Sequence, residues 1–214
     1  MESFNFIFLL EITHDMATKY KKTKKEIAFE ERMKKQRAKR GFSDQDVWSI
    51  DWWFCETIAP MLRQLAKTSH GCPTLDENGD FTDNDHNSDV NIDVYAKRWE
   101  DTLLHMAYLA DEMNEMKCSM KNPYDKDWHR ICRAFDKKYG DMGEKLMSEE
   151  ARLEAEKTGR YPCYLPDADP VHGEENRKIM DLHSEYSNKI IEYREQCKNE
   201  FFVLFSKYFN HLWD

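Results

Sequence analysis

Residues that interrupt regular structure are few in this chain, which has seven glycines and six prolines among 214 residues. Valine, isoleucine and threonine are also sparse, and no stretch alternates convincingly between apolar and polar residues, so no β-sheet is expected. Hydrophobic residues make up 40% and charged residues 34% of the chain, a balance that suits long helices exposed to solvent. The composition therefore predicts an all-α protein.

Paired metal-ligand and disulfide motifs are also missing. The six cysteines form no CxxC pair and no tight cluster, so they are interpreted as reduced thiols, and no metal ligand is predicted. The apolar run at residues 4–10 is too short to span a bilayer and has acidic flanks, so neither a signal peptide nor membrane contact is predicted.

The sequence also lacks the motifs of the common enzyme classes. No phosphate-binding loop and no paired nucleophile and base are visible, and the Asp/Asn-rich loop at residues 74–92 does not match the spacing of an EF-hand. We therefore predict no catalytic residue and no cofactor, and disfavour an enzyme. A metal-dependent nucleotide hydrolase remains an alternative.

The segment from residue 41 to residue 73 carries the clearest helix signals. Ser43 is a candidate N-cap, and Asp46, three residues later, completes an acidic variant of the capping box. An apolar stripe that includes Trp48 and Trp52 continues from this cap at helical spacing, and a His-Gly sequence at 70–71 marks the stop. One central helix is predicted over residues 44–69, with a kink at Pro60.

Asp51 lies within that stripe, with apolar neighbours three and four residues away on both sides. A carboxylate in such a place is expected to be at least partly buried and to need a cation or hydrogen-bond donors. The structural interpretation is a carboxylate bonded to a facing helix. The functional alternatives are a metal ligand or a general base.

Three further long helices are predicted at residues 92–120, 124–158 and 174–212, with the second interrupted near Gly140 and Gly143. Together with helix 44–69 they form a bundle of four, to which a basic N-terminal helix is added. The predicted domains are residues 1–40, an apolar segment followed by a basic arm, and residues 41–214, an acidic helical bundle. No oligomeric state is predicted.

Charge is divided unevenly between these two parts. Residues 19–40 hold eleven Lys or Arg and three Glu, a net charge of +8, whereas the whole chain carries −9 and residues 41–214 carry −14. The arm is either a solvated helix or a nucleic-acid-binding element, since phosphate contacts need only such a cluster, although no interleaved aromatics support base stacking. The candidate nucleic-acid-binding residues are Lys21, Lys22, Lys24, Lys25, Lys34, Lys35, Arg37, Lys39 and Arg40.

A resemblance rests on a Gly-aromatic-Ser-Asp-x-Asp-x-Trp-x-x-Asp opening, a His-Gly-x-Pro stop and a Leu-Trp-Asp end. The residues that carry it are Gly41, Phe42, Ser43, Asp44, Asp46, Trp48, Asp51, His70, Gly71, Pro73, Leu212, Trp213 and Asp214. Over about a third of its length the chain resembles a group of uncharacterised tailed-bacteriophage and prophage proteins of Gram-positive gut bacteria. The resemblance implies a viral origin and the host cytoplasm as the setting, and it implies no activity.

The favoured functional hypothesis is a non-enzymatic phage accessory protein that binds a protein partner in the host cell, as an inhibitor of a host or defence protein that handles nucleic acid. An acidic body would suit the basic groove of such a partner. The candidate contact residues are Glu149, Glu150, Glu154 and Glu156. The alternatives are nucleic-acid binding through residues 19–40 and a structural role in virion assembly.

Overall fold

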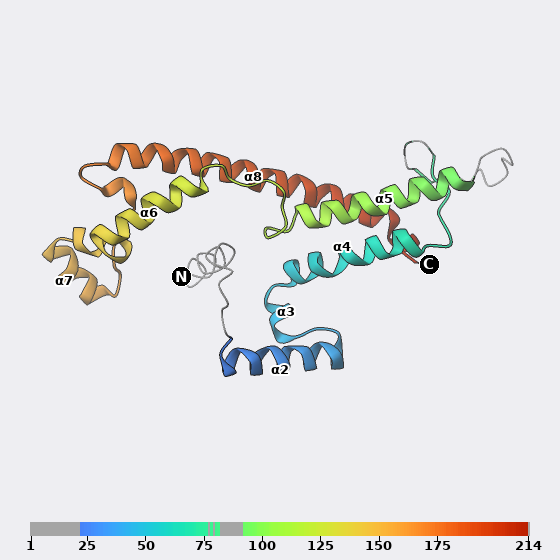
Figure 1. The fold of residues 1–214 in the computed structure, drawn as a ribbon, viewed down its shortest axis with the longest axis horizontal. Helices are drawn as coiled ribbons and strands as arrows, with labels where there is room; N and C mark the ends of the chain where they lie inside the picture. The colour runs from blue at the N-terminus through green and yellow to red at the C-terminus, as the bar shows by residue number, and fades with distance from the viewer. Residues whose placement is uncertain (1–21, 77, 79, 82–91, 214) are drawn as a thin grey trace. The chain divides into compact units, whose positions relative to one another are not determined.

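The computed structural model describes residues 22–76, 78, 80, 81 and 92–213 (Figure 1). The protein has an all-α fold, as the composition predicts, and the described residues contain no β-strand beyond a single bridge between Leu75 and Phe81. The helices are α2 (Lys24–Arg40), α3 (Asp44–Trp48), α4 (Ile50–Thr68), α5 (Ile92–Glu112), α6 (Asp125–Tyr139), α7 (Glu149–Thr158) and α8 (Gly173–Tyr208), with short 3₁₀ turns η1 (Asp141–Leu146), η2 (Pro166–Ala168) and η3 (Phe209–His211).

The chain divides into two compact units, Met1–Phe54 and Cys55–Asp214. The sequence-based domains divide the chain at a different point, after residue 40. Each unit is described by itself below.

Two capping boxes define the helices of the first unit. Thr23 and Glu26 cap the start of α2, and Gly41, in the left-handed region at φ 85°, ends it. Ser43 then starts α3: its hydroxyl accepts the N–H of Asp46 at 3.3 Å, and its own N–H donates to the Asp46 carboxylate at 2.7 Å. The capping box predicted at Ser43 is confirmed.

The long helix predicted over residues 44–69 is broken at one residue. Ser49 has φ −133° and ψ 66°, outside the helical region, and it separates α3 from α4. The helix α4 then starts at Ile50 and continues through Pro60 to Thr68. This break resets the helical phase, so side chains on its two sides do not belong to one stripe.

The second unit is organised along α8, which contacts α5, α6 and η2 (Figure 1). On the α5 side, Trp99 and Tyr208 pack edge to face with ring centroids 5.5 Å apart. Leu103 and Phe201 are fully buried in the same unit. Burial of large aromatic and aliphatic side chains is the main stabilising contribution at such a contact.

Polar contacts fix α6 against α8. The Asn122 amide donates to the carbonyl of His183 at 2.8 Å and to the hydroxyl of Ser187 at 2.9 Å. The His183 ring stacks on Trp128, with centroids 5.2 Å apart, and its Nε2 lies 3.0 Å from the Asp125 carboxylate. These contacts join the start of α6 to the first half of α8.

The C-terminal end of α5 comes earlier than the sequence predicts, at Glu112 rather than near residue 120. The Asn114 side chain accepts the N–H of Met116 at 3.0 Å, and its carbonyl accepts the N–H groups of Lys117 and Cys118. Asn forms such local hydrogen bonds readily, and they compete with helix continuation.

Candidate functional site

The acidic residues singled out in the sequence lie on α7, a short helix capped at both ends. The Ser148 hydroxyl accepts the N–H of Ala151 at 3.2 Å, and Gly159 ends the helix in the left-handed region at φ 68°. Ala155 is buried at 1% exposure and holds the inner side of the helix. Because both ends are satisfied, the short helix is stabilised, and its backbone sets which side chains face outward.

All four candidate carboxylates are exposed on the outer side of this helix, and none of them pairs with a cation within the described residues. They are Glu149, Glu150, Glu154 and Glu156. At 100° per residue, Glu149 and Glu156 share one stripe with Leu153, which is 49% exposed. The structure therefore places the four carboxylates and one apolar side chain on the solvent side of one helix.

Positive-φ residues in η1 position the chain before α7. Met142 has φ 53°, an unusual value for a residue with a side chain, and Gly143 has φ 72°. The carbonyl of Met142 accepts the N–H of Tyr164 at 2.9 Å, and a Cβ on Gly143 would lie 2.7 Å from the Cβ of Tyr164. The connector that follows α7 is therefore held against the turn that precedes it.

A second acidic region surrounds the start of α8, where a hollow of about 460 Å³ is lined by Asp167, Asp169, Glu174, Glu175, Arg177 and neighbouring residues. Asp169 accepts the N–H groups of Val171 at 2.8 Å and His172 at 3.2 Å, and Lys138 lies 3.3 Å away. These backbone donors, with help from Lys138, lower the pKa of Asp169 to about 2. Its role is therefore to hold the η2–α8 corner.

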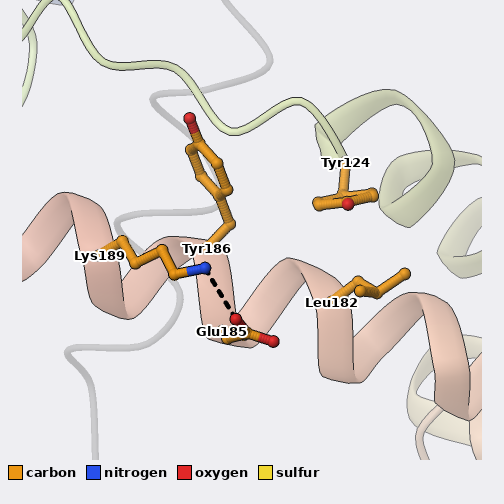
Figure 2. A pocket seen from close by; sticks show the side chains of 5 residues that line it. All are labelled: Tyr124, Leu182, Glu185, Tyr186 and Lys189. Carbon is orange, nitrogen blue, oxygen red and sulfur yellow. Dashed lines mark hydrogen bonds and ion pairs between the residues drawn. The ribbon is translucent and has the colours of Figure 1, made fainter.

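Tyr124 and Lys189 line a much smaller hollow between α6 and α8 (Figure 2). Lys189 points along α8 toward Glu185, with Nζ 2.7 Å from the carboxylate, and Leu182 and Tyr186 complete the lining. Its volume of about 50 Å³ has room for one or two water molecules, well below the size of a typical small-molecule site. This hollow is not a substrate pocket.

The basic residues of the N-terminal arm have two different environments. Arg37 donates to the buried Asp46 from Nε at 2.9 Å and from Nη2 at 2.5 Å, and Arg40 pairs with Asp44. Lys22 pairs with Glu30 at 2.6 Å. Exposed lysines without an ion pair among the described residues are Lys24, Lys25, Lys34, Lys35 and Lys39. Lys21 lies outside the described residues.

The burial predicted for Asp51 is wrong, because its side chain is exposed. The break at Ser49 starts a new helix one residue before Asp51. Asp51 therefore lies in the first turn of α4, where the helix dipole favours a carboxylate at the surface. It has no buried environment that would support a ligand or base role.

The acidic and histidine side chains of α5 and of the turn after it contact separate partners. His105 Nε2 lies 2.7 Å from Glu200, and Glu115 is 3.7 Å from Arg194. Glu112 is buried at 4% exposure and accepts the N–H and hydroxyl of Ser119 at 3.0 and 2.8 Å. Within the described ranges, no group of three or more His, Cys, Asp or Glu side chains is arranged to hold a metal ion.

A half-buried phenol near Glu112 was not singled out in the sequence. Tyr193 lies with its hydroxyl 2.9 Å from that of Tyr108, and its pKa is raised above the usual range, first by this hydrogen bond and then by burial. The helical spacing of Tyr193 and Cys197 predicts that they face the core together. The contact with α5 depends on tertiary packing.

Two tryptophans that were predicted to face the core are exposed. Trp48 is 88% exposed and Trp52 is 42% exposed, although both belong to the apolar stripe expected to face the core. The same stripe further along α4 is buried at Cys55, Ala59 and Leu62. The break at Ser49 takes Trp48 out of the phase of α4. Trp52 lies within α4 and in phase with these residues, but it precedes the buried part of the stripe, which begins at Cys55.

In the part of the chain that the structure describes, no helix has the length and hydropathy needed to cross a membrane. No protein-family model matches the chain, and no match was found among curated proteins or among solved structures.

Proposed function

We propose that this chain is a phage-encoded, non-enzymatic accessory protein that binds a basic host protein through the outer face of α7. The partner is a host or defence protein that handles nucleic acid, and binding inhibits it. The viral origin and the host setting rest on the resemblance of residues 41–73 and of the C-terminal end to phage proteins.

The observation that carries the proposal is the unpaired state of the four α7 carboxylates. Several other carboxylates on helix surfaces lie next to lysines: Asp101 is 3.0 Å from Lys97, and Glu195 is 2.5 Å from Lys198. Arg152 and Lys157 are exposed on the same helix, but neither forms an ion pair with these carboxylates among the described residues, so the carboxylates can pair with an external cation. A cluster of them on a capped helix speeds the encounter with a basic surface and restricts its orientation.

The carboxylates also surround an apolar contact point. Leu153 is half exposed between Glu149 and Glu150 on the helical wheel. Interfaces commonly combine an apolar centre with a polar rim, and the apolar centre supplies much of the affinity. The α7 face has this composition on a small scale.

Charge reversal tests the proposal. The variant Glu149→Lys, Glu150→Lys, Glu154→Lys and Glu156→Lys is expected to lose the basic host proteins that the wild-type chain retains from a lysate at about 50 mM salt. Retention by the wild type is expected to weaken as salt rises, because exposed charges are screened. Mass spectrometry of the retained fractions identifies the partner, and an assay of its nucleic-acid activity tests inhibition.

The matched control reverses four carboxylates on the solvent face of α8, namely Asp181, Glu185, Glu192 and Glu195. It changes the net charge by the same amount, and the surface ion pairs that it removes contribute little to stability. The control is expected to retain the partner. Equal retention by the α7 variant would contradict the proposal.

A further inference from the structure

We infer that the first unit carries a binding site for single-stranded nucleic acid, formed by lysines on one face of α2 and by the exposed aromatic rings of Phe29 and Trp48. This site is independent of the α7 surface. The inference refines the nucleic-acid alternative by naming the helix face, the rings and the type of strand.

The lysines gather on one side of α2. At 100° per residue, Lys24, Lys25, Lys35 and Lys39 fall within about 100° of the helix circumference, and Arg32 falls in the same sector. We call these four lysines the cation face. All four are exposed and have no ion pair among the described residues.

The opposite side of α2 is used internally. Met33 is buried at 2% exposure, and Arg37 and Arg40 bind the carboxylates of Asp46 and Asp44. Two of the basic residues of the arm thus neutralise acidic groups within the unit. The cation face is therefore left with uncompensated positive charge, which a polyanion complements.

Exposed rings accompany these charges. The Arg32 guanidinium, in the sector of the cation face, lies over the Phe29 ring at 5.3 Å. Phe42 lies under the Arg40 guanidinium, which is on the opposite side of α2, and is not part of the site. Trp48, at the end of α3, is 88% exposed. Rings and guanidinium planes of this kind are the surfaces on which unpaired bases stack.

The rings favour a single strand over a duplex. Bases in a duplex are already stacked on each other, whereas a single strand can place a base on an exposed indole without first being opened.

The composition of α2 favours a nucleic acid over a lipid surface as the ligand. Charged residues dominate α2, and its exposed Ile27 and Phe29 do not lie on one side, as a membrane-binding helix requires.

The experiment measures binding of the full chain to a fluorescein-labelled oligo(dT) of about 20 nucleotides by anisotropy, with a duplex of the same length and anionic phospholipid vesicles in parallel. We expect binding to the single strand and weaker binding to the duplex. If about four phosphates are contacted, affinity should fall roughly fiftyfold between about 50 and 200 mM salt.

Two sets of variants identify the site. Lys24→Glu, Lys25→Glu, Lys35→Glu and Lys39→Glu together should abolish binding, while the charge-matched control Lys121→Glu, Lys126→Glu, Lys137→Glu and Lys178→Glu, made at exposed lysines of the second unit, should retain it. Trp48→Ala should weaken binding about tenfold and Trp48→Phe should restore most of it. Trp213→Ala, at another exposed tryptophan, should have no effect.

Several results would overturn the inference. They are absence of binding to the single strand at low salt, equal binding to the duplex with no effect of Trp48→Ala, full binding by the cation-face variant, and binding to vesicles in place of the oligonucleotide. Circular dichroism confirms that each variant keeps its helix content. None of these results bears on partner binding by α7, so the two proposals fail separately.

Discussion

Arg37 and Asp46 form a bidentate ion pair between α2 and α3, with Nε 2.9 Å from one carboxylate oxygen and Nη2 2.5 Å from the other. Asp46 is buried at 2% exposure and also accepts the N–H of Ser43. The pair therefore joins two helices through the side chain that completes the capping box of the second one. Charge-assisted bonds of this geometry are stronger than neutral hydrogen bonds.

The first prediction concerns acid. Arg37, assisted by Ser43, holds the pKa of Asp46 well below its usual range. The folded carboxylate thus binds a proton less readily than the unfolded one, so its stabilising effect is present above about pH 4 and is lost as pH falls further. Amide hydrogen exchange in α2 and α3, corrected for intrinsic rates, should accelerate in this range.

Asp46→Asn should raise exchange in α2 and α3 at neutral pH, by about 30-fold for a loss of about 2 kcal/mol, and should remove most of the acid dependence. Asp44→Asn is the control, because the Asp44 side chain is 64% exposed and its pair with Arg40 is at the surface. Equal effects of the two substitutions would show that the buried pair has no special role.

The second prediction concerns alkali. The hydrogen bond with Tyr108 and burial raise the pKa of Tyr193, so the folded protein keeps this phenol protonated where an unfolded chain releases the proton. The Tyr193 contribution to stability should therefore be present below about pH 10 and decline above it. Spectrophotometric titration of Tyr193→Phe should match that of the wild type up to the pH of alkaline unfolding. A missing phenolate in the variant below that pH would contradict the assignment.

The third prediction concerns the corner between η2 and α8. A Cβ on Gly173 would lie 2.4 Å from the backbone carbonyl oxygen of Asp167, which cannot move without shifting the corner. Gly173→Ala should destabilise the second unit by about 1–3 kcal/mol, measured by chemical denaturation. Gly71→Ala is the matched control, since its Cβ would meet nothing within 4 Å and should be nearly neutral. Similar midpoints for the two variants would count against this packing.

The fourth prediction compares two adjacent phenylalanines. Phe201 is fully buried and stacks on Phe205 with centroids 5.4 Å apart, whereas Phe202 is 48% exposed. Phe201→Ala should lower the free energy of unfolding by about 3–5 kcal/mol and Phe202→Ala by less than about 1 kcal/mol. Thermal unfolding followed by circular dichroism measures both. The opposite ranking would mean that α8 presents its other side to α5.

Local signals in the sequence were sufficient wherever a few neighbouring residues decide the structure. The Ser43–Asp46 capping box, the interruption at Gly140 and the all-α fold are confirmed. Each depends on hydrogen bonds or backbone preferences that act over a few residues. The four α7 carboxylates were also correctly expected at the surface, because their segment is almost wholly charged.

The errors in predicted burial lie around the start of α4. In a helical projection of the sequence, residues 44–69 form one continuous apolar stripe. Because serine does not strongly terminate helices, the sequence does not indicate the turn at Ser49. The burial of Trp48 was inferred across that point and depended on unbroken phase. Asp51 and Trp52 share the phase of Cys55 within α4 and are exposed because the buried part of the stripe begins only at Cys55. The burial of Glu112 and the hydrogen bond between Tyr193 and Tyr108 depend on how α5 packs on α8, which local patterns do not encode.

The break at Ser49 also changes how sequence variation in this region can be tolerated. In an unbroken helix, inserting one residue rotates every later side chain by about 100° relative to every earlier one. Here α3 ends and α4 begins with a fresh set of hydrogen bonds, so the turn can take up a change of length. Cys55, Ala59 and Leu62 would keep their common side while the Ser43–Asp46 box kept its own. The two halves of this segment can therefore diverge in length independently during evolution, and homologous chains should be aligned on each half separately.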